Sequence, residues 1–111
     1  MELDRETQIQ LRKLIRQKIN VDRFRARRTW DNLALELETT DITLRASVKR
    51  DNAKGKLTPQ QLDYVRLMRS EWEKHKEDFK DYTQEAIADQ LGIHQITVQR
   101  WIERVLNEGM R

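Results

Sequence analysis

Apolar residues recur every three or four positions along most of the chain, which is the spacing of one face of an α-helix. Near the N-terminus this stripe contains Leu11, Leu14, Ile15 and Ile19, and Asp4 stands where it can cap the start of the helix. No segment alternates clearly between apolar and polar residues, as a half-buried strand does. The pattern therefore predicts an all-α fold and leaves open only a short β-pair in the polar connections.

A second stripe of the same kind begins after a strong start signal in the middle of the chain. Thr58 is suited to the N-cap position, and Pro59 follows it at the first helical position, where proline is favoured. The apolar residues of this stripe are Leu62, Val65, Met68 and Trp72. These residues predict a second long helix.

Two short helices are predicted behind capping threonines, Thr29 and Thr83, and a further helix is expected after each of them. In the first half of the chain the expected ranges are 30–37 and 40–48, the second of which can extend further. In the second half they are 84–91 and 94–105.

The two sets of helices are related by a shift of 54 positions, without a gap between residues 29 and 50. The identical pairs are Thr29 with Thr83, Ala34 with Ala88, Leu37 with Leu91, Ile42 with Ile96, Thr43 with Thr97, and Arg50 with Arg104. We therefore predict two tandem three-helix repeats, over residues 1–52 and 57–111, joined by a polar linker at 53–56. About 50 residues are marginal for an independent core, so the repeats are expected to pack on each other as an internal pseudo-dimer.

The last two helices of the second repeat carry a pattern with clear physical reasons. Ala88 is small where two helices cross closely, and Gly92 stands in the turn, where a left-handed backbone favours glycine. Ile87, Leu91, Ile93 and Val98 fill the space between the helices. Residues 84–103 resemble the helix-turn-helix of prokaryotic and phage DNA-binding regulators and recombinases. The resemblance implies that the second of these helices is a recognition helix, which lies in the major groove.

Residues 30–49 fit the same template with one departure, because Glu38 replaces the turn glycine. The missing glycine implies a turn that is strained or differently shaped. Thr40 is a good N-cap for the following helix. Asp41 could accept a hydrogen bond from a cytosine amino group, but a favourable interaction with the helix N-terminus is the preferred interpretation.

The outward residues of the two implied recognition helices are the candidates for reading bases. Arginine pairs with guanine and glutamine with adenine, so Gln99 and Arg100 are the best candidates, and Arg45 occupies the place of Gln99 in the first repeat. Ile42 and Ile96 could contact thymine methyl groups or take a core or interface role. An ordinary solvated helix face is the alternative for the whole set. The expected base contacts are Thr43, Arg45, Gln95, Thr97, Gln99 and Arg100.

Positive charge is concentrated in the first half of the chain. The formal net charge is +3, and it divides into +4 for residues 1–55 and −1 for residues 56–111. The arginines between residues 23 and 28 can neutralise phosphates, although a solvated surface and, for the two threonines, helix capping are alternatives. The expected backbone contacts are Arg23, Arg25, Arg27, Arg28, Thr29, Lys49, Arg50, Thr83 and Arg104.

Other classes of protein are disfavoured by the composition of these 111 residues. The chain has no cysteine, which excludes a disulfide-stapled secreted domain, and it has no run long and apolar enough to span a membrane. The N-terminus is too polar for a signal peptide, so a cytoplasmic location is expected.

No catalytic or cofactor site is predicted either. No nucleophile stands with a base and an orienting group, and no glycine-rich loop could cradle a phosphate. His75 and His94 lack the paired spacing of metal ligands, so no metal and no cofactor are expected. Trp30, Trp72 and Trp101 lie at helical positions and are expected in the core, with Trp30 the one that could also abut a DNA backbone.

The expected function is sequence-specific binding of double-stranded DNA by two motifs that read successive major grooves. Because the reading residues differ between the repeats, the two half-sites should differ. A small transcriptional regulator, a conjugation accessory protein or an excisionase-like factor of a mobile element, such as a plasmid or phage, would fit. The alternatives are an assembly scaffold such as a phage packaging subunit, and the DNA-binding front end of a recombinase. The helix stop at residues 106–109 favours a complete small protein.

Overall fold

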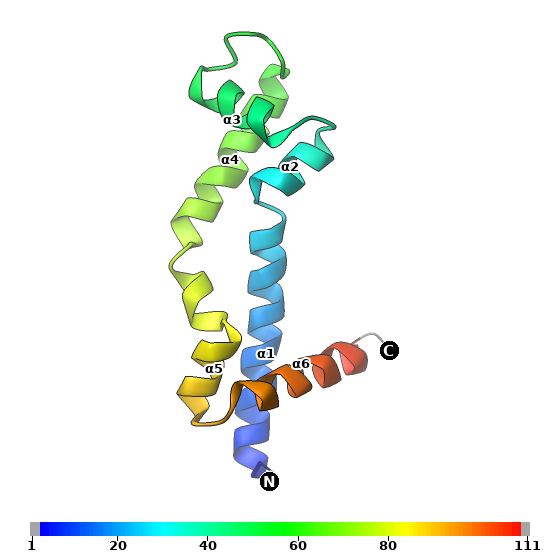
Figure 1. Ribbon diagram of the computed structural model, residues 1–111, viewed down its shortest axis with the longest axis vertical. Helices are drawn as coiled ribbons and strands as arrows, with labels where there is room; N and C mark the ends of the chain where they lie inside the picture. The colour runs from blue at the N-terminus through cyan, green and yellow to red at the C-terminus, as the bar shows by residue number, and fades with distance from the viewer. Residues whose placement is uncertain (1–2, 110–111) are drawn as a thin grey trace. The chain divides into compact units, whose positions relative to one another are not determined.

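The computed structural model describes residues 3–109, which form six α-helices and one short 3-10 helix (Figure 1). This range contains no strand, so the predicted all-α class is confirmed and the described connections hold no β-pair. The elements are α1 (Arg5–Ala26), α2 (Trp30–Glu36), α3 (Asp41–Lys49), α4 (Pro59–His75), η1 (Asp78–Tyr82), α5 (Gln84–Leu91) and α6 (Gln95–Gly109).

Threonine side chains cap the N-termini of four helices, as the sequence predicts. The Thr29, Thr40, Thr58 and Thr83 hydroxyls each accept a hydrogen bond from a backbone N–H in the first turn of α2, α3, α4 and α5. At the start of α4 the bond is reciprocated, because the Gln61 side chain accepts from the Thr58 N–H, which completes a capping box. Each cap satisfies a backbone donor that the helix itself leaves unpaired.

The helices form two compact units, and each unit takes helices from both halves of the chain. Unit 1 contains residues 1–22 and 77–111, and unit 2 contains residues 23–76. This grouping differs from the predicted division into 1–52 and 57–111, because α1 packs with α5 and α6 while α4 packs with α2 and α3. The apolar pattern predicts the two long helices but not their partners, since both carry similar aliphatic stripes.

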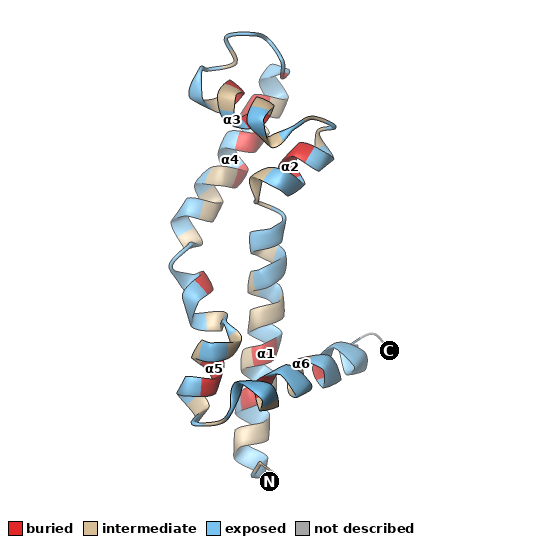
Figure 2. Ribbon diagram, viewed as in Figure 1, coloured by how far each residue is buried: buried red, intermediate tan, exposed pale blue. Residues whose placement is uncertain are grey.

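The core of unit 1 lies where α1 meets α5 and α6 (Figure 2). Leu11 and Ile15 of α1 are fully buried there, together with Ile87 of α5 and Val98 of α6. Ala88 is also buried, as expected for the small residue at the crossing of α5 and α6. This packing fixes the face of α6 that is left for solvent.

The core of unit 2 lies between α2, α3 and α4. Leu33 and Leu44 are fully buried, and Val65 of α4 closes the core. Leu57 is also buried, so the predicted linker at 53–56 is a connection between α3 and α4 within this unit. The buried residues of this core are Leu33, Ala34, Leu44, Leu57, Leu62, Val65 and Met68.

Candidate nucleic-acid interface

Two pairs of helices, α2–α3 and α5–α6, are joined by turns with the same backbone conformation. Gly92 ends α5 with a φ of +66°, and Glu38 follows α2 with a φ of +56°. In each turn the next residue donates a hydrogen bond back to an alanine carbonyl, from Ile93 to Ala88 at 3.0 Å and from Thr39 to Ala34 at 2.9 Å. The glutamate therefore makes the α2–α3 turn strained rather than differently shaped, because non-glycine residues rarely adopt this region.

The solvent-facing side of α6 carries most of the predicted base contacts of the second motif. Gln95, Gln99 and Arg100 are exposed, whereas Val98 between them is fully buried in the core of unit 1. Thr97 is only half-buried. The spacing of the three exposed residues places them on one side of the helix, over its first two turns. This is the part of a recognition helix that meets base edges in a helix-turn-helix complex.

On α3 the predicted reading residues are engaged within the unit. The Arg45 guanidinium lies 3.3 Å from the Asp41 carboxylate and 5.4 Å from the centre of the Trp30 ring. The Thr43 hydroxyl accepts a hydrogen bond from the Thr40 hydroxyl at 2.9 Å. Arg45 is nevertheless well exposed, so it can reach a base only by leaving Asp41.

A second arginine, Arg69, also contacts the Trp30 ring that Arg45 contacts. The Arg69 guanidinium is 4.6 Å from the centres of both the Trp30 and the Trp72 rings. Burial lowers the pKa of Arg69, and the nearby positive charge of Arg45 acts in the same direction. Trp30 packs against the core of unit 2. In this unit it therefore holds two cations rather than offering an open stacking platform.

Arg28, predicted as a phosphate contact, is used inside unit 2. Its side chain is only 14% exposed, lies 3.1 Å from the Glu71 carboxylate and donates 2.8 Å to the Phe24 carbonyl. Its guanidinium also covers the Phe24 ring at 3.6 Å. Arg23, Arg25 and Arg27 are exposed, so the predicted cluster consists of one interior arginine and three surface ones.

The other predicted backbone contacts fall into three groups. The Thr29 and Thr83 hydroxyls accept backbone hydrogen bonds as helix caps, so their geometry is explained without DNA. Arg104 lies 4.7 Å from the centre of the Trp101 ring and 3.6 Å from the Glu108 carboxylate. Lys49 and Arg50 are exposed at the C-terminal end of α3.

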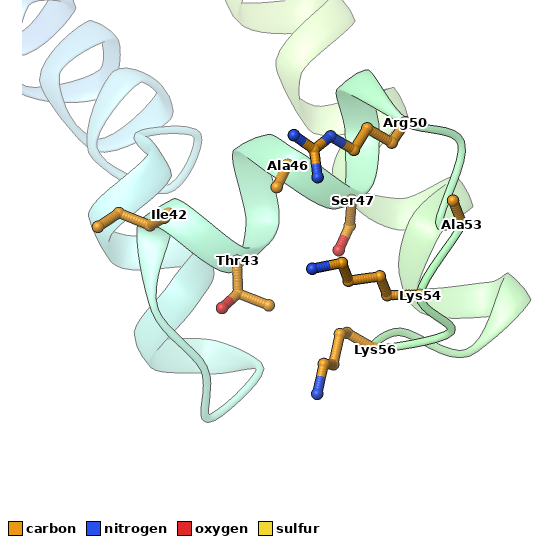
Figure 3. Close-up of a pocket in the computed structure, with 8 residues that line it drawn as sticks. All are labelled: Ile42, Thr43, Ala46, Ser47, Arg50, Ala53, Lys54 and Lys56. Carbon is orange, nitrogen blue, oxygen red and sulfur yellow. The ribbon is translucent and has the colours of Figure 1, made fainter.

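Sequence reasoning missed two cations next to Arg50. Lys54 and Lys56 belong to the predicted linker, but in the structure they line a hollow of about 180 Å³ beside α3 (Figure 3). Ser47, the single buried polar residue among those described, lines the same hollow. The sequence did contain a signal for this site, because Arg50, Lys54 and Lys56 stand within seven residues directly after a predicted recognition helix.

The opposite end of α6 is tied to α1 by an ion pair. The Arg12 guanidinium donates to the Glu108 carboxylate and also lies 5.0 Å from the centre of the Trp101 ring. The hydrogen bond from Arg12 lowers the pKa of Glu108. These contacts hold the C-terminal part of α6 on α1. They therefore leave the exposed residues in the first two turns of α6 unobstructed.

Within residues 3–109 no group of three or more His, Cys, Asp or Glu residues is arranged to hold a metal ion. His75 instead packs edge-on against the Phe24 ring, with 5.3 Å between the ring centres. None of the helices in this range has both the length and the apolar character needed to cross a membrane.

Residues 68–110 match the family model of the Homeodomain-like domain. This segment contains the end of α4, η1, and the α5–turn–α6 pair described above. The match supports a helix-turn-helix DNA-binding domain in this part of the chain, in agreement with the predicted motif. Searches of curated proteins and of solved structures each gave no significant match.

Proposed function

We propose that this protein binds double-stranded DNA in a sequence-specific manner and that α6 is its principal reading helix. The observation that carries the proposal is the match of a homeodomain-like helix-turn-helix domain to α5 and α6, whose exposed face bears Gln95, Gln99 and Arg100. Arg100 is suited to the O6 and N7 atoms of guanine, and Gln99 to the N6 and N7 atoms of adenine.

Selection from a random-sequence duplex library tests this proposal directly. We expect an enriched motif, and we expect Arg100→Ala to weaken binding by about 1–3 kcal/mol and to relax specificity at one position. Arg5→Ala is the matched control, since Arg5 is also an exposed arginine on a helix of unit 1. Failure to enrich any motif, or equal losses for Arg100→Ala and Arg5→Ala, would refute the proposal.

We further propose that α2 and α3 form a second reading motif and that one chain occupies two unlike half-sites in successive major grooves. The shared turn conformation at Glu38 and Gly92 supports this proposal. The half-sites should differ because Arg45 and Ala46 stand where α6 has Gln99 and Arg100. Phosphate contacts are assigned to exposed cations outside the reading faces, namely Arg23, Arg25, Arg27, Lys49 and Arg50.

A bipartite, non-palindromic selected motif is the expected result for two such readers on one chain. Arg45→Ala should relax one half of the motif and Arg100→Ala the other. A palindrome, or a single half-site that only Arg100→Ala alters, would contradict the second motif. A binder of this kind fits a small transcriptional regulator or an accessory protein of DNA transfer or recombination.

One observation favours a second function, that of an assembly scaffold. Ile42 and Ile96 are large aliphatic side chains that are 76% and 57% exposed, and they occupy matching positions on α3 and α6. A scaffold predicts weak duplex binding without sequence preference, together with self-association that Ile42→Ser or Ile96→Ser reduces. DNA readout predicts instead that these variants lose affinity at positions with a thymine methyl group.

A further inference from the structure

The hollow beside α3 is lined by side chains of α3, by Arg50 at the end of that helix, and by residues of the loop that follows, including Lys54 and Lys56 (Figure 3). Arg50, Lys54 and Lys56 give this lining its positive charge, and none of the described residues that line it is acidic. Thr43 and Ser47 present their hydroxyl-bearing side chains from α3, and Figure 3 shows Lys54 extending back toward this helix. Cations and hydroxyl donors around one space are the groups that bind phosphate oxygens.

The loop that carries the two lysines is held in place, so it is not a free linker. Asp51 and Asn52 both have a positive φ, at +51° and +56°. The Asn52 side chain donates to the Leu57 carbonyl at 2.6 Å and accepts from the Leu57 N–H at 3.1 Å, and Leu57 itself is buried. The lysines between these two anchors are therefore presented next to the end of α3.

Two acidic residues of α3 and the loop after it, Asp41 and Asp51, are already paired with other cations. Asp51 lies 2.7 Å from the Arg66 guanidinium, and Asp41 in the first turn of α3 lies 3.3 Å from that of Arg45. Both carboxylates are thus countered by arginines that do not line the hollow. The three lining cations keep their excess positive charge for an anion.

We propose that this hollow binds a phosphate group of the DNA backbone that flanks the groove read by α3. The inference rests on the proposed function and adds a site to it. A phosphate would accept hydrogen bonds from Lys54, Lys56 and Arg50. Such a contact positions α3 along the duplex and carries no sequence information itself.

The charge of the site is tested by the salt dependence of duplex binding. The selected duplex is titrated by fluorescence anisotropy at several salt concentrations, with the wild type and with Lys54→Gln/Lys56→Gln. The variant should bind more weakly, and the slope of log K against log salt should become shallower by about 1 for each phosphate that the variant no longer neutralises. Lys13→Gln/Lys74→Gln removes the same charge from exposed helix positions elsewhere and should leave the slope nearly unchanged.

The location of the contact is tested by replacing single phosphates of the duplex with neutral methylphosphonates. For the wild type, one replacement beside the α3 half-site should weaken binding, and for Lys54→Gln/Lys56→Gln that same replacement should weaken it much less, because only Arg50 remains to contact that phosphate. Additive losses at every position, or a slope equal to that of the control pair, would overturn the inference and leave the proposed function intact. Absence of duplex binding by the wild type would instead refute the proposed function, and the phosphate site with it.

Discussion

Replacement of Glu38 by glycine should stabilise unit 2. Glu38 ends the turn after α2 with a φ of +56°, a conformation that its Cβ atom makes unfavourable. The corresponding turn after α5 has glycine at this point, with nearly the same φ of +66° and the same backbone hydrogen bond to an alanine carbonyl. The substitution therefore removes a local strain without changing the path of the chain.

The size of the effect follows from two opposing terms. A left-handed backbone costs a residue with a side chain about 1–2 kcal/mol. Glycine at position 38 avoids this cost but loses more backbone entropy on folding, about 0.5–1 kcal/mol. The net gain should be about 0.5–1 kcal/mol in the free energy of unfolding, equivalent to several degrees in Tm for a unit of this size.

Urea denaturation and thermal unfolding of matched variants measure this gain. Glu38→Gln removes the charge but keeps the Cβ atom, so it isolates the contribution of the backbone. Gly92→Ala is the reciprocal change and should cost about 1 kcal/mol, since a Cβ atom at Gly92 would meet nothing within 4 Å and only the backbone conformation opposes it. If Glu38→Gly is no more stable than Glu38→Gln, the account of strain in this turn is wrong.

Three further substitutions test contacts that fix the two units. Asn52→Ala removes both hydrogen bonds between the Asn52 side chain and the Leu57 backbone, and it should lower the free energy of unfolding by about 2 kcal/mol in urea denaturation. An unchanged urea midpoint would contradict an anchored loop. The hydrogen bond from Arg12 lowers the pKa of Glu108 below its ordinary value of 4.5. The ion pair therefore stabilises the fold fully above pH 4.5, and this stabilisation is lost as the pH falls through the lowered pKa of the folded state. The wild type should therefore lose its advantage over Glu108→Gln on acidification, and a constant difference would refute the pairing. The hydrogen bond to Glu36 raises the pKa of Tyr64 above 10.0, so Glu36→Gln should shift tyrosinate formation, followed by ultraviolet absorbance, to lower pH; an unaltered titration would exclude the bond.

The helix boundaries were largely predictable because their signals are local. Thr29, Thr58 and Thr83 each precede a helix and each accepts the expected hydrogen bond. Gly92 adopts the left-handed conformation that the predicted turn requires. These features depend on a few neighbouring residues, so the sequence contains the information directly.

The partners of the long helices were not predictable from the same patterns. Leu11 and Ile15 form a stripe that could pack against either short helix pair, and so do Leu62 and Val65. A stripe shows that a helix face is buried but carries no information on which surface buries it. The division of the chain by sequence order therefore differs from the grouping of helices in space.

The candidate site was predictable only where it depends on helical spacing. Gln99 and Arg100 lie on the exposed face of α6, as the periodicity of that helix implies. Arg28 is engaged by Glu71, a residue 43 positions away, and Lys54 lines a hollow that forms only when the loop folds back to α3. Such contacts depend on tertiary structure and leave no periodic trace in the sequence.

Each long helix packs with the short helices of the other half of the chain, α1 with α5 and α6, and α4 with α2 and α3. This arrangement determines which fragments of the protein can fold. A fragment ending at Lys54 would contain α2 and α3 without α4, and α1 without α5 and α6, so neither core would be complete. Mixed with the remaining fragment, it should recover helicity by complementation, because each piece supplies what the other lacks. Neither compact unit is encoded by one half of the gene. A truncation in the loop at residues 53–56 therefore leaves both units without helices that their cores require.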